Sequence, residues 1–186
     1  MNGKNFSPRE NLSHIIFITG GTKSGKSEFA EHLAKETEKL SYVALSGNNR
    51  DDEEWQKKID LHQKRRPKDW KLIETTDLIN TLIKENGPLL IDSIGGFVME
   101  SIERENKEWL TKMNSLIGFL KKRKNMTFIV GEQVGWSLVS EYKIGNTYIE
   151  RIGELQKRIT KISKDNWLAI NGRAIKIDEI SLEIPT

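Results

Sequence analysis

The sequence contains no cysteine in its 186 residues, and long apolar runs and excess charge are also missing. Without cysteine, neither disulfides nor thiolate metal sites can form, which agrees with a reducing cytoplasm as the location. No apolar run approaches the ~20 residues that cross a bilayer, so we expect no membrane span. The formal net charge is only +3, with acidic residues dispersed among the basic ones. Nucleic acid is therefore not the expected partner.

One glycine-rich stretch of the chain matches a known ligand-binding pattern. Residues 20–27 read GGTKSGKS and fit G-x-x-x-x-G-K-[ST] at every fixed position. A β-branched run at 14–19 precedes them, and apolar residues at 29, 30, 33 and 34 follow with helical spacing. A strand, a tight turn and a helix in this order are typical of a phosphate-binding loop, where backbone N–H groups approach phosphate oxygens. The expected nucleotide-binding residues are Gly20, Gly21, Thr22, Lys23, Ser24, Gly25, Lys26 and Ser27.

Three side chains are expected to neutralise the charge of the bound phosphates, either directly or by holding a metal ion. Lys26 should reach the β- and γ-phosphates, and Ser27 should offer its hydroxyl to Mg²⁺. Asp92 ends an apolar run at 88–92, which places a carboxylate at the carboxyl edge of a sheet. We expect Ser27 and Asp92 to hold the metal ion, directly or through water. The alternative for Asp92 is a cap on the following helix, because many strands end in Asp for that reason.

Strand-like apolar runs recur along the chain, and most are separated by stretches with helical spacing. They lie at 14–19, 41–46, 71–74, 88–92, 126–131, 166–171 and 173–178. Continuous apolar runs are typical of central parallel strands that are covered on both faces. The dipeptide Asn171-Gly172 between the last two runs predicts a β-hairpin. We therefore predict a flexible extension at 1–12 and one α/β domain at 13–186 that is a P-loop NTPase (RecA-like) fold with three layers, a mostly parallel sheet and a C-terminal hairpin.

A histidine lies in the predicted helix between the second and third strand-like runs. This helix has an acidic start and a basic end, as the helix macrodipole favours. Its residues Trp55, Ile59, His62 and Arg66 are spaced by four, three and four and so share one face. Taken alone, a histidine in such a helix is usually a surface or packing residue. A second basic cluster, at 121–124, is interpreted as a solvated helix end.

Several motifs taken together narrow the family. They are the phosphate loop, Tyr42-Val43-Ala44, Asp52-Glu53-Glu54-Trp55, His62 five residues before Pro67, Arg66-Pro67 and Trp70. In this combination the chain resembles the bifunctional adenosylcobinamide kinase/adenosylcobinamide-phosphate guanylyltransferase family of cobalamin biosynthesis. The likeness covers about residues 14–178, and the H-x-x-x-R-P segment is its most specific part.

The resemblance implies a two-step enzyme. In that family the histidine matching His62 becomes guanylylated, so His62 and Lys26 would be catalytic and Arg66 would join the nucleotide-binding residues. A neutral imidazole can attack the α-phosphorus of GTP and expel pyrophosphate. The substrates would be ATP, GTP, adenosylcobinamide and its phosphate, the product adenosylcobinamide-GDP, and Mg²⁺ the cofactor. The family's homotrimer would be the oligomeric state.

The chain departs from the family pattern in two places. The family's N-E-V-G-x-G-x-V-P corresponds to residues 132–140, with Gln133 in place of Glu and Ser140 in place of Pro. Its R-x-F-R-D-x-x-G corresponds to residues 146–153, with Asn146 and Ile149 in place of both arginines. Losing two guanidinium groups removes bidentate contacts to phosphate or carboxylate. The sequence does not decide whether the kinase or the guanylyltransferase activity is altered.

Three other functions stay open from the sequence. The chain could be another P-loop kinase for a small metabolite, in which His62 would be structural. It could also be a nucleotide-binding regulatory protein with reduced turnover, which the residues at 133, 146 and 149 would favour. A single-stranded nucleic-acid ATPase is disfavoured by the low net charge. The preference between ATP and GTP and the corrinoid-binding residues are not readable from the sequence.

Overall fold

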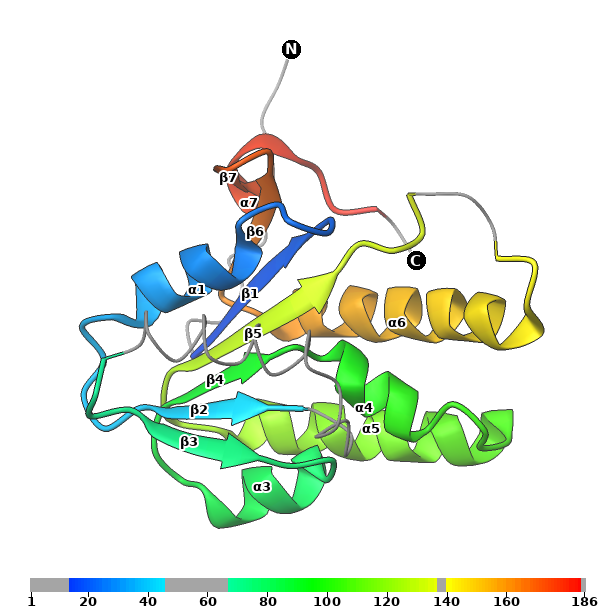
Figure 1. Cartoon of the computed structure of the whole chain (residues 1–186), viewed down its shortest axis with the longest axis horizontal. Helices are drawn as coiled ribbons and strands as arrows, with labels where there is room; N and C mark the ends of the chain where they lie inside the picture. The colour runs from blue at the N-terminus through cyan, green and yellow to red at the C-terminus, as the bar shows by residue number, and fades with distance from the viewer. Residues whose placement is uncertain (1–13, 46–66, 137–139, 185–186) are drawn as a thin grey trace, which may run out of the picture.

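The computed structural model describes residues 14–45, 67–136 and 140–184. Within this part of the chain, seven strands form one sheet in the order β3-β2-β4-β5-β1-β6-β7. The strands are β1 (Ile15–Gly20), β2 (Ser41–Ala44), β3 (Lys71–Glu74), β4 (Leu89–Asp92), β5 (Thr127–Glu132), β6 (Asp165–Ile170) and β7 (Arg173–Lys176). The first six pair in parallel, and β7 pairs antiparallel with β6 (Figure 1).

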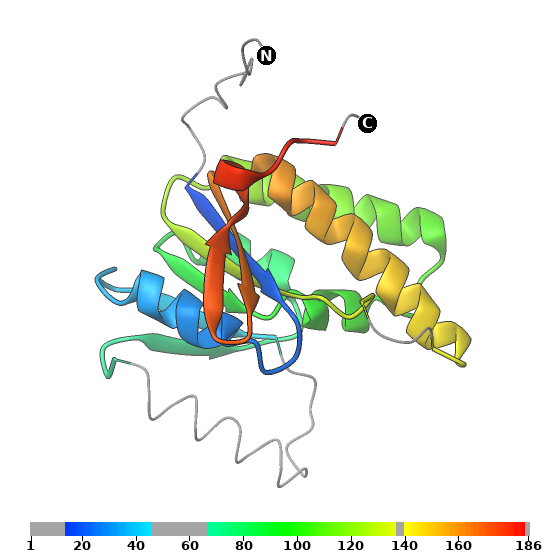
Figure 2. The same ribbon diagram turned by 90° about the horizontal axis from the view of Figure 1, so that it is seen from above.

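Helices cover both faces of this sheet. They are α1 (Lys26–Ala34), α3 (Leu78–Lys84), α4 (Gly95–Glu100), α5 (Asn106–Lys122), α6 (Lys143–Ile162) and α7 (Ile177–Ile180). Figure 2 shows α1 on one face of the sheet and the long helices α5 and α6 on the other. This gives the three-layer arrangement that the sequence predicted.

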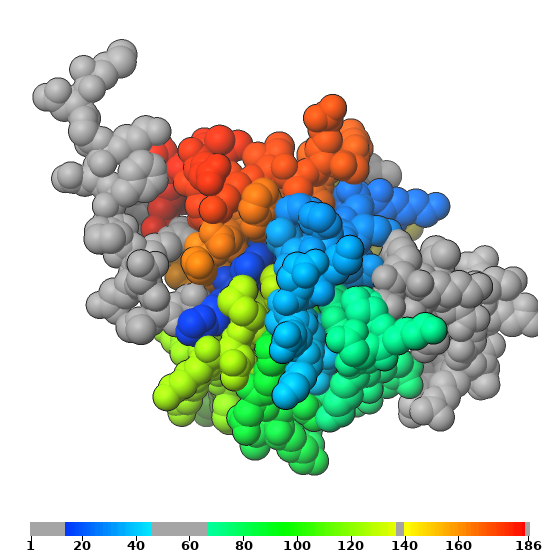
Figure 3. All heavy atoms as spheres, turned by 90° about the vertical axis from the view of Figure 1, so that its left-hand side faces the viewer, coloured from blue at the N-terminus to red at the C-terminus, as the bar shows by residue number. Residues whose placement is uncertain are grey.

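Two apolar clusters explain why the central strands read as continuous apolar runs. In β1, Ile15 and Phe17 belong to the cluster under α3, α4, α5 and α6, whereas Ile18 belongs to the cluster under α1. In β5, Ile129 and Phe128 divide between the two clusters in the same way. Successive strand residues point to opposite faces, so a sheet buried on both sides needs an apolar side chain at every position. Figure 3 shows α1, in blue, lying across one of these faces.

The predicted fold class is confirmed, and most predicted strands match within one or two residues. The hairpin is also confirmed, since Asn171 (φ 49°) and Gly172 (φ 73°) both adopt the left-handed conformation that a two-residue turn needs. The strand predicted to reach residue 178 was wrong at its end. It stops at Lys176 because Asp178 turns back in α7, where its Oδ2 accepts a hydrogen bond from the backbone N–H of Asn166 at 2.7 Å.

The basic cluster at 121–124 divides in two. Lys121 and Lys122 form the last turn of α5 and are exposed, as predicted for a solvated helix end. Arg123 instead donates hydrogen bonds to the carbonyl of Glu85 (2.7 Å) and to Thr127 Oγ1 (2.8 Å), and so ties α5 to the start of β5. Among the described residues, no helix is both long and apolar enough to cross a membrane. The predicted extension at 1–12 lies outside these residues.

Candidate functional site

The two fixed glycines of the phosphate loop are both required by the backbone. Gly25 has φ 91°, a conformation that residues with a Cβ adopt only with strain. A Cβ on Gly20 would run into the carbonyl oxygen of Ala169 in β6 and lie 2.6 Å from Ser24 Oγ. The C-terminal hairpin also supports the loop, since the N–H of Gly172 donates to the carbonyl of Ser24 at 3.1 Å. The loop is therefore held in one conformation by its neighbours.

The loop ends at a helix start that is open to an anion. Gly25 is the N-cap of α1 and has no side chain to accept from the first-turn N–H groups. Such a helix end attracts negative charge. The Nζ of Lys26 donates to the carbonyl of Gly21 at 3.1 Å, which holds the ammonium over the loop. Ser24 Oγ is buried without a hydrogen-bond partner in the described part of the chain. These features suit a phosphate group, as predicted.

The remaining loop residues are less constrained. Thr22 and Lys23 are exposed, and Ser27 is half-buried in the first turn of α1. A Cβ on Gly21 would meet no atom within 4 Å, so the described residues do not require glycine at that position. Contacts of these residues with a nucleotide stay predictions.

Asp92 lies at the same edge of the sheet but one strand away from the loop. It ends β4, and β5 separates β4 from β1. The hydroxyl of Tyr42 donates to Asp92 Oδ2 at 2.6 Å and so orients the carboxylate. The capping alternative is wrong, because α4 begins with Ile94 as its N-cap and has no side-chain cap.

The donors at this edge suit Mg²⁺. Ser27 and Asp92 supply a hydroxyl and a carboxylate oxygen, the hard ligands that this ion prefers. Among the described residues, no group of three or more acidic or histidine side chains could enclose a metal.

Glu132 is a site residue that the sequence interpretation missed. It is the last residue of β5 and pairs with Gly20, where β1 ends and the phosphate loop begins. The hydroxyl of Ser93 donates to Glu132 Oε1. An acidic residue directly after an apolar run was the signal that singled out Asp92, and Glu132 follows the run at 126–131 in the same way. The same rule would have found it.

Burial dominates the electrostatics of Glu132. It raises the pKa of this carboxyl above the ordinary glutamate range, and the charge of Asp92 adds to that effect. The hydrogen bond from Ser93 and the charge of Lys26 act in the opposite direction. Burial also raises the pKa of Tyr148, and the negative charge of Glu132 raises it further. Glu132 is thus a half-buried acid beside the phosphate loop, with its Oε2 atom buried.

We expect the Glu132→Gln variant to be more thermally stable than the wild-type protein at neutral and higher pH. The pKa of Glu132 is raised in the fold, so its protonated form is the one that the folded state favours. The contribution of Glu132 to the free energy of unfolding is therefore complete below the ordinary glutamate pKa and is lost as the pH rises through the raised value. A glutamine still accepts from Ser93 but cannot ionise. Melting temperatures measured from pH 4 to 9 should show a gap between variant and wild type that widens with pH. A constant gap would contradict this explanation.

A buried hydrogen-bond chain accounts for glutamine at position 133. Gln156 Nε2 donates to the carbonyl of Glu132 (2.9 Å), so its Oε1 accepts from Thr19 Oγ1 (2.8 Å). The Thr19 hydroxyl has then used its proton, and Gln133 Nε2 donates to it at 3.0 Å. A carboxylate at position 133 could not make this last bond. The departure from the family pattern therefore fits its surroundings.

The two departures from the second family motif, Asn146 and Ile149, both lie in α6. Asn146 Nδ2 donates to the carbonyl of Ser140 at 3.0 Å, which closes the turn leading into α6. Ile149 lies near Gly135, with its Cγ2 3.4 Å from where a Cβ would stand on that glycine. Both residues make contacts within the chain, whereas an arginine would offer charged donors.

His62 and Arg66 lie outside the described residues. Their segment leaves the sheet at the end of β2, where Ala44 pairs with Asp92. It rejoins the described chain at Pro67, and Trp70 then stacks on Tyr42 with ring centroids 6.5 Å apart. Ala44, shortly before this segment in the chain, thus lies at the same edge of the sheet as Asp92 and the phosphate loop. The catalytic role of His62 stays a prediction.

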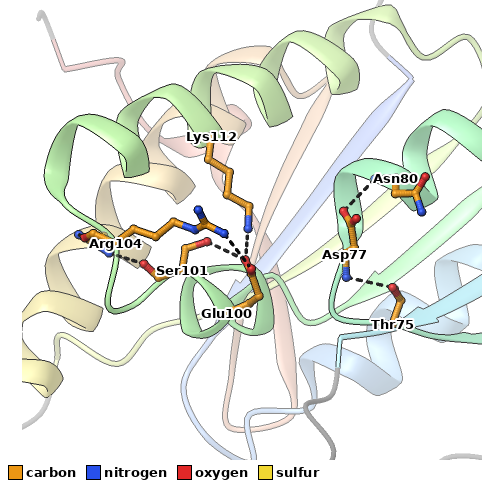
Figure 4. Close-up of polar contacts among 8 residues, drawn as sticks. Thr75, Asp77, Asn80, Glu100, Ser101, Arg104 and Lys112 are labelled. Atoms are coloured by element: carbon orange, nitrogen blue, oxygen red, sulfur yellow. Dashed lines mark hydrogen bonds and ion pairs between the residues drawn. The ribbon is translucent and has the colours of Figure 1, made fainter.

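A separate hollow of about 480 Å³ shares no residue with this site. It is lined by Met99, Glu100, Ile102, Glu103, Arg104 and Glu108. Figure 4 shows that Glu100 accepts from Ser101 (2.8 Å), Arg104 (3.4 Å) and Lys112. The same view shows Asp77 capping α3 by accepting from the N–H of Asn80 at 3.0 Å. Glu100 and Arg104 are thus paired with each other, and the hollow contains no residue of the phosphate loop. The phosphate-loop edge is therefore the candidate active site.

Comparison with known proteins agrees with this arrangement. The family model described as cobinamide kinase / cobinamide phosphate guanyltransferase matches residues 16–177. The chain is 24% identical over 181 residues to the bifunctional adenosylcobalamin biosynthesis protein CobU of Escherichia coli (strain K12), which covers 88% of this chain and 99% of that protein. It is also 24% identical over 181 residues, with the same coverage, to the CobU protein of Salmonella typhimurium (strain LT2).

Two further similarities are more partial or more remote. The chain is 25% identical over 150 residues to the bifunctional adenosylcobalamin biosynthesis protein CobP of Pseudomonas aeruginosa, covering 77% of this chain and 86% of that protein. A solved structure of project PH0250 from Pyrococcus horikoshii OT3 aligns with a TM-score of 0.51 at 8% identity, over 92% of this chain and 91% of that one. The second similarity shows a shared fold alone.

Proposed function

The chain belongs to the cobinamide kinase / cobinamide phosphate guanyltransferase family, and from that premise we propose that it acts on adenosylcobinamide in two steps. It first transfers the γ-phosphoryl group of ATP or GTP to the adenosylcobinamide hydroxyl. It then transfers GMP from GTP to the phosphorylated product and gives adenosylcobinamide-GDP. The observation that carries this proposal is the phosphate loop with the Lys26 ammonium over it, at the sheet edge that also holds Asp92.

The loop's own residues serve both steps. In each step a nucleoside triphosphate binds with its terminal phosphates in the loop, near the Lys26 ammonium and the open start of α1. In the first step these groups stabilise the charge on the transferred phosphoryl group, and in the second the charge on departing pyrophosphate. Ser27 and Asp92 would hold Mg²⁺, which neutralises phosphate charge when bound.

We further propose that GMP transfer passes through His62. A neutral imidazole nitrogen attacks the α-phosphorus of GTP, the bond to pyrophosphate breaks, and a guanylyl-histidine forms. The phosphate oxygen of adenosylcobinamide phosphate then attacks the same phosphorus and frees the histidine. The family motif supports His62 as the nucleophile and Arg66 as a nucleotide contact. The position of Ala44, which precedes their segment and pairs with Asp92 at the edge of the sheet that holds the loop, is consistent with both roles.

Labelling with GTP tests this proposal directly. The purified protein incubated with GTP labelled at the α-phosphorus should retain an acid-labile label on the chain, as expected of a phosphoramidate. The His62→Ala variant should lose the label completely because it has no nucleophile. The matched control is His32→Ala, since His32 is an exposed histidine in α1 and should label like the wild type. Equal labelling of the His62→Ala variant would overturn the intermediate.

The same assays separate the alternatives. Phosphorylation of a different small acceptor, without any GMP adduct, would select another P-loop kinase. Tight binding of GTP without release of pyrophosphate or ADP would select a regulatory protein. The family's homotrimer is also carried to this chain as a proposal, which sedimentation equilibrium would test.

A further inference from the structure

Glu132 occupies a position beside the phosphate loop that the two proposed steps leave without a role. Its backbone pairs with Gly20, the residue from which the loop starts, and the N–H of the next residue, Gln133, donates to the Gly20 carbonyl at 3.0 Å. Lys26 is near enough for its charge to act on the Glu132 carboxyl. This carboxyl therefore lies close to where the terminal phosphates of a bound nucleotide are expected.

The carboxyl group is tightly held. Its Oε1 accepts from the Ser93 hydroxyl, one residue after Asp92. Gly95, the first residue of α4, packs so closely that a Cβ there would lie 2.7 Å from Oε1 and 2.8 Å from Oε2. The hydrogen bond to Ser93 and the close approach of Gly95 therefore restrict the position of the carboxyl group. Such rigidity is expected of a side chain that positions a reacting group.

The second oxygen of this carboxyl has no donor. Oε2 is buried and lacks a hydrogen-bond partner among the residues that the structure describes. A buried acceptor without a partner destabilises the fold, so such a group is expected to have a use in the native protein. A phosphate oxygen would be repelled by the carboxylate. A hydroxyl group that arrives beside the phosphates would supply the missing hydrogen bond.

Resting on the function proposed above, we propose that Glu132 is the catalytic residue that accepts the proton of the acceptor alcohol during phosphoryl transfer. Oε2 of Glu132 accepts a hydrogen bond from the adenosylcobinamide hydroxyl. The alcohol oxygen forms a bond to the γ-phosphorus, and the bond from that phosphorus to the β–γ bridging oxygen breaks. The nucleoside diphosphate leaves with the electron pair. The hydroxyl proton ends on Oε2 and passes to solvent after product release.

The acceptors differ in their need for a base. An alcohol is about as weakly acidic as water, with a pKa of roughly 16, so its proton must be removed as the new bond forms. The His62 imidazole attacks in its neutral form through a nitrogen that carries no proton. A phosphate ester has a second pKa of about 6 and is ionised at neutral pH. Only the kinase step therefore requires Glu132.

The experiment measures the two half-reactions separately in the full-length protein. The first assay follows phosphorylation of adenosylcobinamide by ATP, and the second follows GMP transfer from GTP to adenosylcobinamide phosphate. Glu132→Gln keeps the shape and the contact with Ser93 but cannot take a proton. We expect it to lower kcat of the first reaction by about 10²- to 10⁴-fold and to leave the second within about threefold. Glu103→Gln, at an exposed glutamate, is the control and should change neither.

A second variant tests the way in which the carboxyl group is held. Ser93→Ala removes the hydrogen bond to Oε1 but leaves the base, so we expect a loss of about tenfold in the first reaction only. Unchanged phosphorylation by the Glu132→Gln variant would overturn the inference. A loss of both reactions in a variant that melts normally would also overturn it, because Glu132 would then act on the nucleotide or its metal ion. If the wild-type protein itself performs neither reaction, the proposed function fails and this inference fails with it.

Discussion

The Lys26→Ala variant should lose both proposed activities, with kcat/KM lowered about 10³-fold or more in each. The reason is that Lys26 supplies the mobile positive charge of the loop. In this structure its Nζ donates to the Gly21 carbonyl at 3.1 Å, and this bond holds the ammonium group beside the loop where phosphate oxygens are expected. One loop serves the transfer of the γ-phosphoryl group in the first step and the departure of pyrophosphate in the second. Separate steady-state assays of phosphorylation and GMP transfer would measure the loss.

The control for this prediction lies at the other end of the same helix. Lys35 is exposed and caps the C-terminus of α1, far along the helix from the loop, and Lys35→Ala should keep both activities. The melting temperature of the Lys26→Ala variant should stay close to that of the wild type, because the structure gives its ammonium a single hydrogen bond. A variant that loses phosphorylation yet still forms the GMP adduct would contradict the use of one loop for both steps.

The Arg151→Met variant should be the most destabilised of the substitutions considered, by about 3–5 kcal/mol in the free energy of unfolding. Arg151 lies in α6, is 8% exposed, and packs over the ring of Trp109. Its Nη1 donates to the carbonyls of Ser101 (2.6 Å) and Ile102 (3.1 Å), and its Nη2 donates to that of Arg104 (2.6 Å). These carbonyls follow the end of α4, where the helix itself provides no donors.

Methionine isolates the hydrogen-bond contribution because it fills much of the volume of the arginine stem but cannot donate. The carbonyls of Ile102 and Arg104 would then lose their donor, and the buried contact to the Ser101 carbonyl would be reduced to the N–H of Arg104 at 3.1 Å. The same change at Arg158 is the control. Arg158 lies in the same helix, is 40% exposed, and pairs with Glu154 at 3.0 Å, so Arg158→Met should cost no more than about 1 kcal/mol. Urea unfolding at pH 7 would compare the two, and equal costs would show that water replaces the contacts of Arg151.

Local patterns in the sequence were sufficient for the fold class and the phosphate loop. A loop whose backbone must turn through a positive φ requires glycine at that residue, and Gly25 shows this at φ 91°. The hairpin at Asn171 and Gly172 could be predicted for the same reason. Strands that are buried on both faces must be apolar at each position, so their positions along the chain could be predicted from continuous apolar runs. Each of these features depends on neighbours in the sequence.

Other features depend on which strands become neighbours in space. Asp92 and Glu132 both follow apolar runs, and nothing in the sequence says which lies nearer to the loop. The strand order β4-β5-β1 gives that position to Glu132. Arg151 reads as one more charged residue on an amphipathic helix, and only packing of α6 against the end of α4 gives it three carbonyl partners. Interactions between residues that lie far apart in the sequence are determined by tertiary packing.

The sequence by itself thus determined that this chain has a strand, a glycine loop and a helix arranged to bind phosphate, because backbone conformation there leaves little choice of residue. It also carried the motifs that suggested the family, which the family model then matched over residues 16–177. Only the tertiary structure decided that a second carboxyl, that of Glu132, lies beside that loop and accepts a hydrogen bond from Ser93. The physical reason is that burial and the pairing of parallel strands bring together residues that are distant in the chain.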